Sequence, residues 1–283
     1  MSLLLGKLET RLNVLAADSE SILGFGVEDL TSGEQLLING DEIFPVASTI
    51  KVAILIEFFK QVEAGRLDPL SPVVYSEKHK TMGSGVFKTL TPDMVTTPLI
   101  DHVTLMVTVS DNTSTNLIID LLGRDVVNET LLELGLVKTR LTRKMMDFES
   151  LKAGVDSVTT PREMLHLFEV LHRGKGISPF VREETLKMLK QPKEGLIQGV
   201  IRNSVQDNIE VADKSGWVGS ATQDVGIVYQ PNRPYIVGVY SKYVPGTDLH
   251  MLNTLNDLTC ATRLIHTYFT EISNSTPNGR RRV

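Results

Sequence analysis

The fold and the chemistry of this chain both centre on the stretch Phe44-Pro45-Val46-Ala47-Ser48-Thr49-Ile50-Lys51. An apolar-rich run follows it to about Gly65, so we expect a long helix to begin near Ser48. Residues three apart on a helix share a face, which places Lys51 beside Ser48. The first backbone N–H groups of a helix lack intrahelical partners and favour negative charge. Ser48, with an amine in reach, is therefore a candidate activated nucleophile.

The spacing between Ser48 and Lys51 is weak evidence when it stands alone. With ordinary serine and lysine usage, S-x-x-K occurs by chance roughly once in a chain of this length. In the simplest alternative, Ser48 caps the helix and Lys51 is a solvated side chain of its first turn. Further motifs are needed to choose between these interpretations.

The composition is that of an ordinary globular protein. The 283 residues, 41% hydrophobic and 22% charged, are enough for one large domain or two closely packed lobes. A net charge of −5 and a pI of about 5.7 argue against nucleic acid or an anionic membrane as a partner. The histidines are scattered along the chain, so we expect no metal site and no other cofactor.

The single cysteine and the N-terminus bear on the cellular compartment. Cys260 alone cannot form an intramolecular disulfide, and its helical context favours a small buried side chain. The apolar run at residues 3–5 is too short for a signal peptide, and no stretch approaches the roughly 20 apolar residues of a membrane span. We therefore expect a cytoplasmic monomer that binds no membrane, or a secreted form if a leader has been removed.

Segments with strand character lie near both ends of the chain, with helical segments between them. We expect strands at 22–27, 35–38, 209–213, 223–230 and 235–240, and helices at 2–16, 48–65, 101–110, 113–122, 125–135, 161–173, 179–190 and 249–271. The stretches 66–100 and 138–159 are predicted to be irregular, and a connection as long as the second is usually functional or disordered. The terminal strands should meet in one sheet lobe, formed by residues 1–48 and 195–283, with residues 49–194 as a helical lobe.

Two later motifs carry side chains suited to binding and proton transfer. Ser110-Asp111-Asn112 supplies a hydroxyl and an amide, although all three residue types also favour helix N-caps. Ser114-Thr115-Asn116 repeats the S-x-N spacing deeper in an apolar helix, so we prefer the first. Lys214-Ser215-Gly216 follows a strand and suits a carboxylate or carbonyl group, with a strand-terminating turn as the alternative. The glycine-flanked segment at 82–87 could line a site, although a plain surface turn is the simpler interpretation.

Together and in this order, S-x-x-K, S-D-N and K-S-G resemble the motif set of the class A β-lactamases and penicillin-binding proteins. The resemblance covers almost the whole chain and extends to Asp213 before the last motif and to Thr159-Thr160-Pro161. It implies an α/β (α+β) fold of the β-lactamase/transpeptidase type. In that fold an antiparallel five-stranded sheet is flanked by the N- and C-terminal helices and joined to an all-helical lobe.

The resemblance also implies a role for each motif residue. Ser48 would be the acylated nucleophile, with Lys51 as its proton acceptor and Ser110 as the relay to the leaving nitrogen. Asn112 would bind the substrate's side-chain amide. Lys214 and Ser215, with Gly216 allowing close approach, would hold a substrate carboxylate, and the backbone N–H groups of Ser48 and Trp217 would form the oxyanion hole.

The chain departs from the family pattern at two places. The loop glutamate that activates the deacylating water in class A enzymes is replaced by Met145, whose thioether cannot accept a proton. Glu149 and Asp147 are nearby carboxylates, and Glu149 is a possible deacylation base, although a solvated carboxylate or a pair with Arg143 is the simpler interpretation. The family's arginine near the last motif also lacks a counterpart, since Gln223-Asp224 occupies that region, so carboxylate recognition should be weaker or different.

These observations predict a serine hydrolase of the class A β-lactamase family that opens β-lactam amide bonds through an acyl-enzyme, with slow deacylation. A D-Ala-D-Ala-type peptidase, an esterase or amidase, and a non-hydrolysing penicillin-binding sensor are the alternatives. A sensor would normally be tied to a membrane segment, and a purely structural relative would have lost a motif, whereas all three are present. The substrate in every case is a small molecule or a short peptide.

Overall fold

A computed structural model describes residues 3–193, 198–219, 221–243, 248–276 and 279–280. Its centre is a five-stranded antiparallel sheet of order β2-β1-β9-β8-β7. The strands are β1 (Ile22–Asp29), β2 (Gln35–Ile38), β7 (Val211–Val218), β8 (Ala221–Val228) and β9 (Tyr235–Lys242). Because β1 pairs along its whole length with β9, the two ends of the chain share one sheet, as the sequence predicts.

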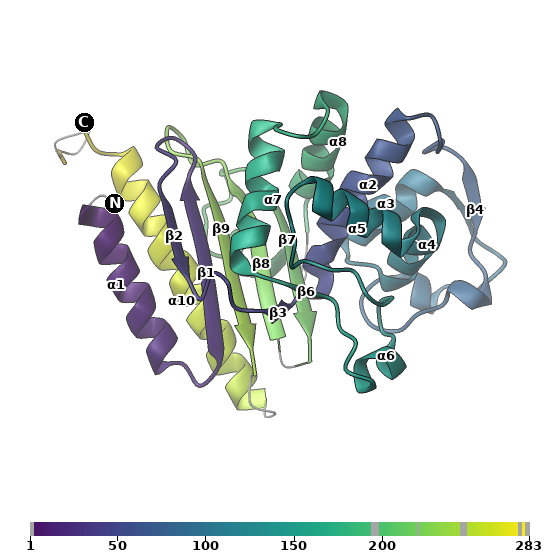
Figure 1. The fold of residues 1–283 in the computed structure, drawn as a ribbon, viewed down its shortest axis with the longest axis horizontal. Helices are drawn as coiled ribbons and strands as arrows, with labels where there is room; N and C mark the ends of the chain where they lie inside the picture. The colour runs from purple at the N-terminus through teal and green to yellow at the C-terminus, as the bar shows by residue number, and fades with distance from the viewer. Residues whose placement is uncertain (1–2, 194–197, 220, 244–247, 277–278, 281–283) are drawn as a thin grey trace.

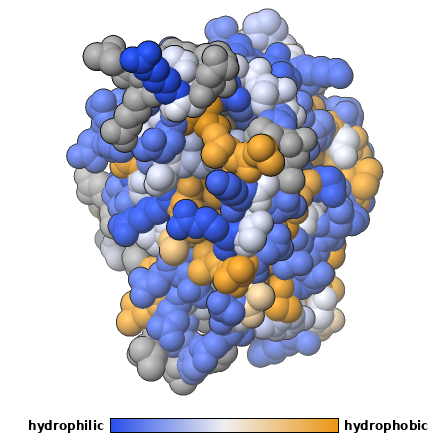
Figure 2. All heavy atoms as spheres, turned by 90° about the vertical axis from the view of Figure 1, so that its left-hand side faces the viewer, coloured by the Kyte–Doolittle hydropathy of each residue, from blue (hydrophilic) through white to orange (hydrophobic). Residues whose placement is uncertain are grey.

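Two terminal helices cover one face of this sheet (Figure 1). They are α1 (Leu3–Asp18) and α10 (Asp248–Ser273). Leu5, Leu8 and Leu12 of α1 pack with buried residues of α10 and the sheet in one apolar cluster. The outer surface on this side is mainly hydrophilic, with apolar side chains confined to separate groups (Figure 2). The predicted flanking of the sheet by the first and last helices is confirmed.

The opposite face of the sheet is covered by helices from the middle of the chain. The helix α7 (Pro161–Arg173) packs on β1, β8 and β9, and α8 (Pro179–Lys190) packs on β7 and on α2 (Lys51–Glu63). Thr160 and Ser178 cap α7 and α8 by accepting a backbone N–H, and proline follows each cap, as expected for helix starts. The division into lobes at residues 49 and 194 stays a prediction.

The helical lobe is built around α2, whose residues Lys51–Phe59 are all buried. The surrounding helices are α3 (Leu99–Thr108), α4 (Asn112–Leu122) and α5 (Arg124–Glu133). The remaining short elements are β3 (Phe44–Pro45), η1 (Ala47–Ile50), β4 (Pro72–Val74), η2 (Glu77–His79), η3 (Phe87–Thr89), β5 (Thr96–Pro98), α6 (Phe148–Lys152), β6 (Val158–Thr159) and α9 (Gly199–Arg202). The stretches predicted to be irregular therefore contain short strands: β4 pairs with β5 within residues 66–100, and β6 in the second stretch pairs with β3, which precedes Ser48.

Two further expectations are corrected by the structure. Lys214-Ser215-Gly216 lies inside β7, which continues to Val218, and so does not end the strand. Cys260 is exposed, because its position on α10 faces away from the apolar cluster. Within the described part of the chain, no helix is both long and apolar enough to span a membrane.

Candidate active site

Ser48 lies where the sheet meets the helical lobe, in the short 3₁₀ turn η1 that leads into α2. The segment before it is fixed by the pairing of β3 with β6 and by the bond from Val46 N to Ser157 O at 2.9 Å. Ala47 has a φ of +44°, a left-handed conformation that costs a non-glycine residue on the order of 1–3 kcal/mol. The surrounding contacts thus hold Ser48 on a strained turn rather than on a regular helix.

Lys51 joins the first two motifs. Its buried Nζ lies 2.8 Å from Ser110 O, 2.9 Å from Ser110 Oγ and 3.0 Å from Asn112 Oδ1. Burial, and then the charge of Lys214, lower the pKa of Lys51 well below that of an ordinary lysine. A neutral amine keeps two of these contacts as a donor and can accept the Ser110 hydroxyl proton in the third. The solvated Lys51 of the simpler interpretation is therefore excluded.

Asp111 holds the second motif in place. Its carboxylate caps α4 through Ser114 N at 2.8 Å and also accepts from Val86 N at 2.6 Å and Phe87 N at 3.0 Å. These bonds hold the segment at 82–87 against the start of α4. The same segment is also bound through Ser84, whose carbonyl oxygen accepts from Asn112 N at 3.0 Å. That segment is therefore part of the site, the interpretation that we had ranked below a plain surface turn, and Ser84 lines both cavities beside Ser48.

Lys214, Ser215 and Gly216 reach the site from β7. A Cβ added to Gly216 would lie 2.9 Å from Ser48 N and 3.0 Å from Ala47 Cβ, so only glycine lets the strand approach the turn this closely. Lys214 is fully buried and donates to Ser215 O at 2.7 Å. Burial, and then the charge of Lys193, lower the pKa of Lys214 to about 7. All three motifs thus converge on Ser48.

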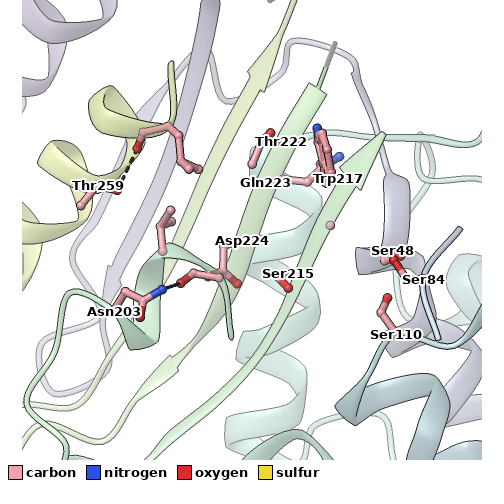
Figure 3. Close-up of a pocket in the computed structure, with 14 residues that line it drawn as sticks. Ser48, Ser84, Ser110, Asn203, Ser215, Trp217, Thr222, Gln223, Asp224 and Thr259 are labelled. Atoms are coloured by element: carbon pink, nitrogen blue, oxygen red, sulfur yellow. Dashed lines mark hydrogen bonds between the residues drawn. The ribbon is translucent and has the colours of Figure 1, made fainter. Parts of the chain in front are cut away.

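Two cavities open beside Ser48. One of about 250 Å³ also contacts Ser84, Ser110 and Ser215 and runs past Asp224 to Leu255 and Thr259 of α10 (Figure 3). The other, of about 500 Å³, contains Asn112. Its lining combines apolar residues (Met145, Met146, Phe148, Leu151, Trp217 and Val218) with the charged and polar side chains of Lys88, Arg143, Asp156 and Ser157. A substrate bound at Ser48 can therefore extend in two directions.

Met145 lines the same cavity as Ser48, and its position is fixed by Asn116, a residue of the S-x-N pattern that we had ranked second. Asn116 accepts from Met145 N at 2.8 Å and donates to Met145 O at 3.1 Å, gripping that residue's backbone on both sides. Because Met145 is remote from Asn116 in the sequence, the S-x-N pattern around Asn116 could not predict that Asn116 binds the Met145 backbone. The clamp therefore fixes the position of Met145, one of several loop residues that line the larger cavity.

The structure does not support Glu149 as a deacylation base. Its side chain is 86% exposed on α6 and pairs with Lys152 at 2.9 Å. Asp147 caps the same short helix through Ser150 N. Arg143 pairs with Asp156 at 2.8 Å, and not with Glu149 as we had considered. Within the described residues, neither loop carboxylate that we considered reaches the cavities beside Ser48.

A serine on a turn, a buried amine of lowered pKa and a lysine-bearing strand define a serine hydrolase of the acyl-enzyme class. The chain belongs to the Beta-lactamase enzyme family, whose model matches residues 7–263. Its fold is the β-lactamase/transpeptidase fold that we expected.

Known proteins resemble the chain over most of its length. Beta-lactamase AER-1 of Aeromonas hydrophila is 28% identical, covering 77% of this chain and 72% of the relative. Beta-lactamase CARB-4 of Pseudomonas aeruginosa is 25% identical, covering 83% and 81%. Among solved structures, PBP-A has a TM-score of 0.83 at 26% identity, covering 94% of this chain and 97% of that one. An ancestral class A β-lactamase has a TM-score of 0.81 at 26% identity, covering 93% and 100%.

Proposed function

We propose that this protein opens β-lactam rings by forming an acyl-enzyme at Ser48 and releases the product slowly. The observation that carries the acylation half is the buried Lys51 amine, held by Ser110 and Asn112 next to the nucleophile's turn. Names of the curated relatives, such as Beta-lactamase AER-1, support the substrate class.

The site residues divide the acylation step between them. Ser48 Oγ attacks the lactam carbonyl while Lys51, neutral because of its burial, takes the hydroxyl proton directly or through water. The carbonyl oxygen gains negative charge, which the N–H groups of Ser48 and Trp217 stabilise. The C–N bond then breaks, and the nitrogen takes a proton through the Ser110 hydroxyl. Asn112 binds the side-chain amide, and Lys214 and Ser215 hold the opposite end of the substrate.

Slow release follows from the side chains that border the acyl group. Hydrolysis of the ester needs a base near the attacking water. The loop has the Met145 thioether in place of the family's glutamate, and Asp156, a loop carboxylate that lines the same cavity, is paired with Arg143. Loss of a general base typically removes about 10²–10⁴ in rate. One solved relative, a point mutant of PBP-A, is an acyl-enzyme complex with penicillin G, which supports formation of an ester of this kind.

Mass spectrometry of the intact protein tests this proposal. After incubation with several penicillins and cephalosporins, we expect a stoichiometric increase in mass that persists for minutes and is absent in Ser48→Ala. A protein that gains no mass with any β-lactam contradicts the proposal.

A peptidase or esterase acting on acyclic substrates is the second candidate, favoured by the same replacement of the family's loop glutamate by Met145. It would cleave D-Ala-D-Ala peptides or short esters, and β-lactams would trap it as inhibitors. Parallel turnover assays on a β-lactam, a D-Ala-D-Ala peptide and an activated ester separate the two. Turnover of the peptide or ester with only stoichiometric reaction of the β-lactam favours this second function.

A further inference from the structure

Asp224 is a buried acid in the cavity that begins at Ser48. It lies directly across from Ser215 in the β7–β8 pairing, so the two side chains share one face of the sheet. Asp224 is 1% exposed, and both residues line the cavity of about 250 Å³ with Ser48 and Ser110 (Figure 3). A substrate that reaches past Ser215 therefore meets a carboxyl group.

The hydrogen bonding of Asp224 is incomplete. Its Oδ2 accepts from Ile201 N of α9 at 2.9 Å, whereas Oδ1 is buried without a hydrogen-bond partner among the described residues. Two cations near this end of β7 are already engaged, because Lys193 at 3.1 Å and Arg202 at 2.7 Å both bind Asp213. A buried polar atom without a partner costs about 1–3 kcal/mol, so Oδ1 is suited to a partner supplied by a ligand.

We propose that Asp224 determines substrate specificity: the cavity beside Ser215 takes an uncharged polar group, such as an amide, hydroxyl or ester, and disfavours a free carboxylate. This inference rests on acyl transfer at Ser48 as proposed above. A neutral polar group can exchange a hydrogen bond with Asp224 in either protonation state, whereas an anion at the same place loses hydration and is repelled once Asp224 ionises.

The charge of Asp224 gives this preference a pH dependence. Burial, and then the charge of Asp213, raise the pKa of Asp224 to about 8, so the group is protonated at neutral pH and ionises above it. A substrate carboxylate should then be repelled more strongly as pH rises from 7 to 9. The titratable and charged groups around it are Asp213 and Lys214 on β7, Lys193 after α8, Arg202 on α9 and Tyr240 on β9.

Lys214 requires a control, because its own pKa of about 7 also weakens carboxylate binding as pH rises. Asp224→Asn keeps the acceptor for Ile201 N and removes the ionisation, so it separates the two groups. Asp207→Asn removes an exposed carboxylate before β7 and is the matched charge control.

The experiment compares acylation rate constants for benzylpenicillin and its methyl ester from pH 6 to 9. We expect the wild-type protein to favour the ester increasingly above pH 7, and Asp224→Asn to shift the ester-to-acid ratio toward the acid by about tenfold at pH 9. Asp207→Asn should leave the ratio unchanged. A wild-type preference for the free acid, or an identical pH profile in Asp224→Asn, overturns the inference.

If the proposed β-lactam function is wrong, the experiment gives a result that differs from failure of the Asp224 inference. If neither penicillin labels Ser48, the same ratio is measured with activated aryl esters that carry either a carboxylate or its amide at the far end. A preference for the amide that is lost in Asp224→Asn supports the specificity role without β-lactam chemistry. If Asp224→Asn does not fold, the wild-type preference itself is the test, and a preference for the carboxylate contradicts the role.

Discussion

Lys51 shows how burial turns an ordinary residue into a base. A lysine in water is protonated at neutral pH and cannot accept the serine proton. Here desolvation and the neighbouring charge of Lys214 oppose the ammonium form, while three oxygen atoms within 3.0 Å keep the amine fixed. The position of Lys51 and its protonation state are therefore consequences of the same packing.

The pH dependence of acylation tests this interpretation of Lys51. Because its pKa lies below the ordinary value, the neutral base forms at a lower pH, and the acylation rate should rise as pH increases through that lowered pKa. Lys51→Arg keeps the proton at every pH and should reduce acylation by about 10²–10⁴. Rapid-quench mass spectrometry against a β-lactam gives both results. An acylation rate that Lys51→Arg leaves unchanged would remove Lys51 from the mechanism.

Met145 is the residue at which a single change should alter the outcome of the reaction. Asn116 fixes its backbone, so a glutamate there would face the same cavity as Ser48. We expect Met145→Glu to accelerate deacylation by about 10²-fold or more while acylation changes little. Stopped-flow hydrolysis of a chromogenic cephalosporin should show the burst of the wild-type protein replaced by steady turnover.

Glu149→Gln is the matched control for that variant. Its side chain is solvated and paired with Lys152, so its removal should leave the burst and the slow phase as they are. Rapid wild-type turnover that disappears in Glu149→Gln would instead show that the loop moves and that Glu149 acts as the base.

At the scale of elements, the close approach of β7 to η1 depends on the absence of a side chain at Gly216. A methyl group at residue 216 would press on the backbone nitrogens of Ser48 and Thr49, at 2.9 and 3.2 Å. Gly216→Ala should therefore displace the oxyanion donor and lower the acylation rate by about 10²–10³. Circular dichroism and thermal melting of the same variant show whether the fold is kept. A variant that folds and acylates normally contradicts the close-approach role of Gly216.

The elements also show what the sequence could and could not predict. The starts of α7 and α8 were predictable, because Thr160-Pro161 and Ser178-Pro179 combine a side-chain cap with proline in the first turn. The pairing of β3 with β6 was not, because two-residue strands have no periodicity and depend on partners more than a hundred residues away.

The same contrast applies to the site. Ser48, Lys51 and the other motif residues carry local patterns, whereas the clamp by Asn116 and the exposure of Glu149 depend on tertiary contacts.

At the scale of the whole molecule, the site lies between two separately packed cores. One apolar cluster includes α2, α7 and α8 with the inner face of the sheet, and the other joins α1 and α10 to the outer face. Ser48 and Lys51 lie next to residues of the first cluster, whereas the cavity that passes Asp224 reaches Val200 and Leu255 at the edge of the second. The α1 side of the second cluster is away from Ser48, so its loss should affect stability and activity to different extents.

Leu12 offers a direct test of that separation. It is fully buried in the second cluster, and truncation of a buried leucine typically costs about 2–5 kcal/mol. Leu12→Ala should lower the free energy of unfolding by that amount in a urea titration, while the acylation rate at 20 °C stays within about twofold as long as the native state is populated. Leu4→Ala, on the exposed side of the same helix, should change stability by no more than about 0.5 kcal/mol. Because α1 contacts the sheet only on its outer face, a Leu12→Ala protein that remains folded but loses acylation would show that the terminal helices help to shape the site.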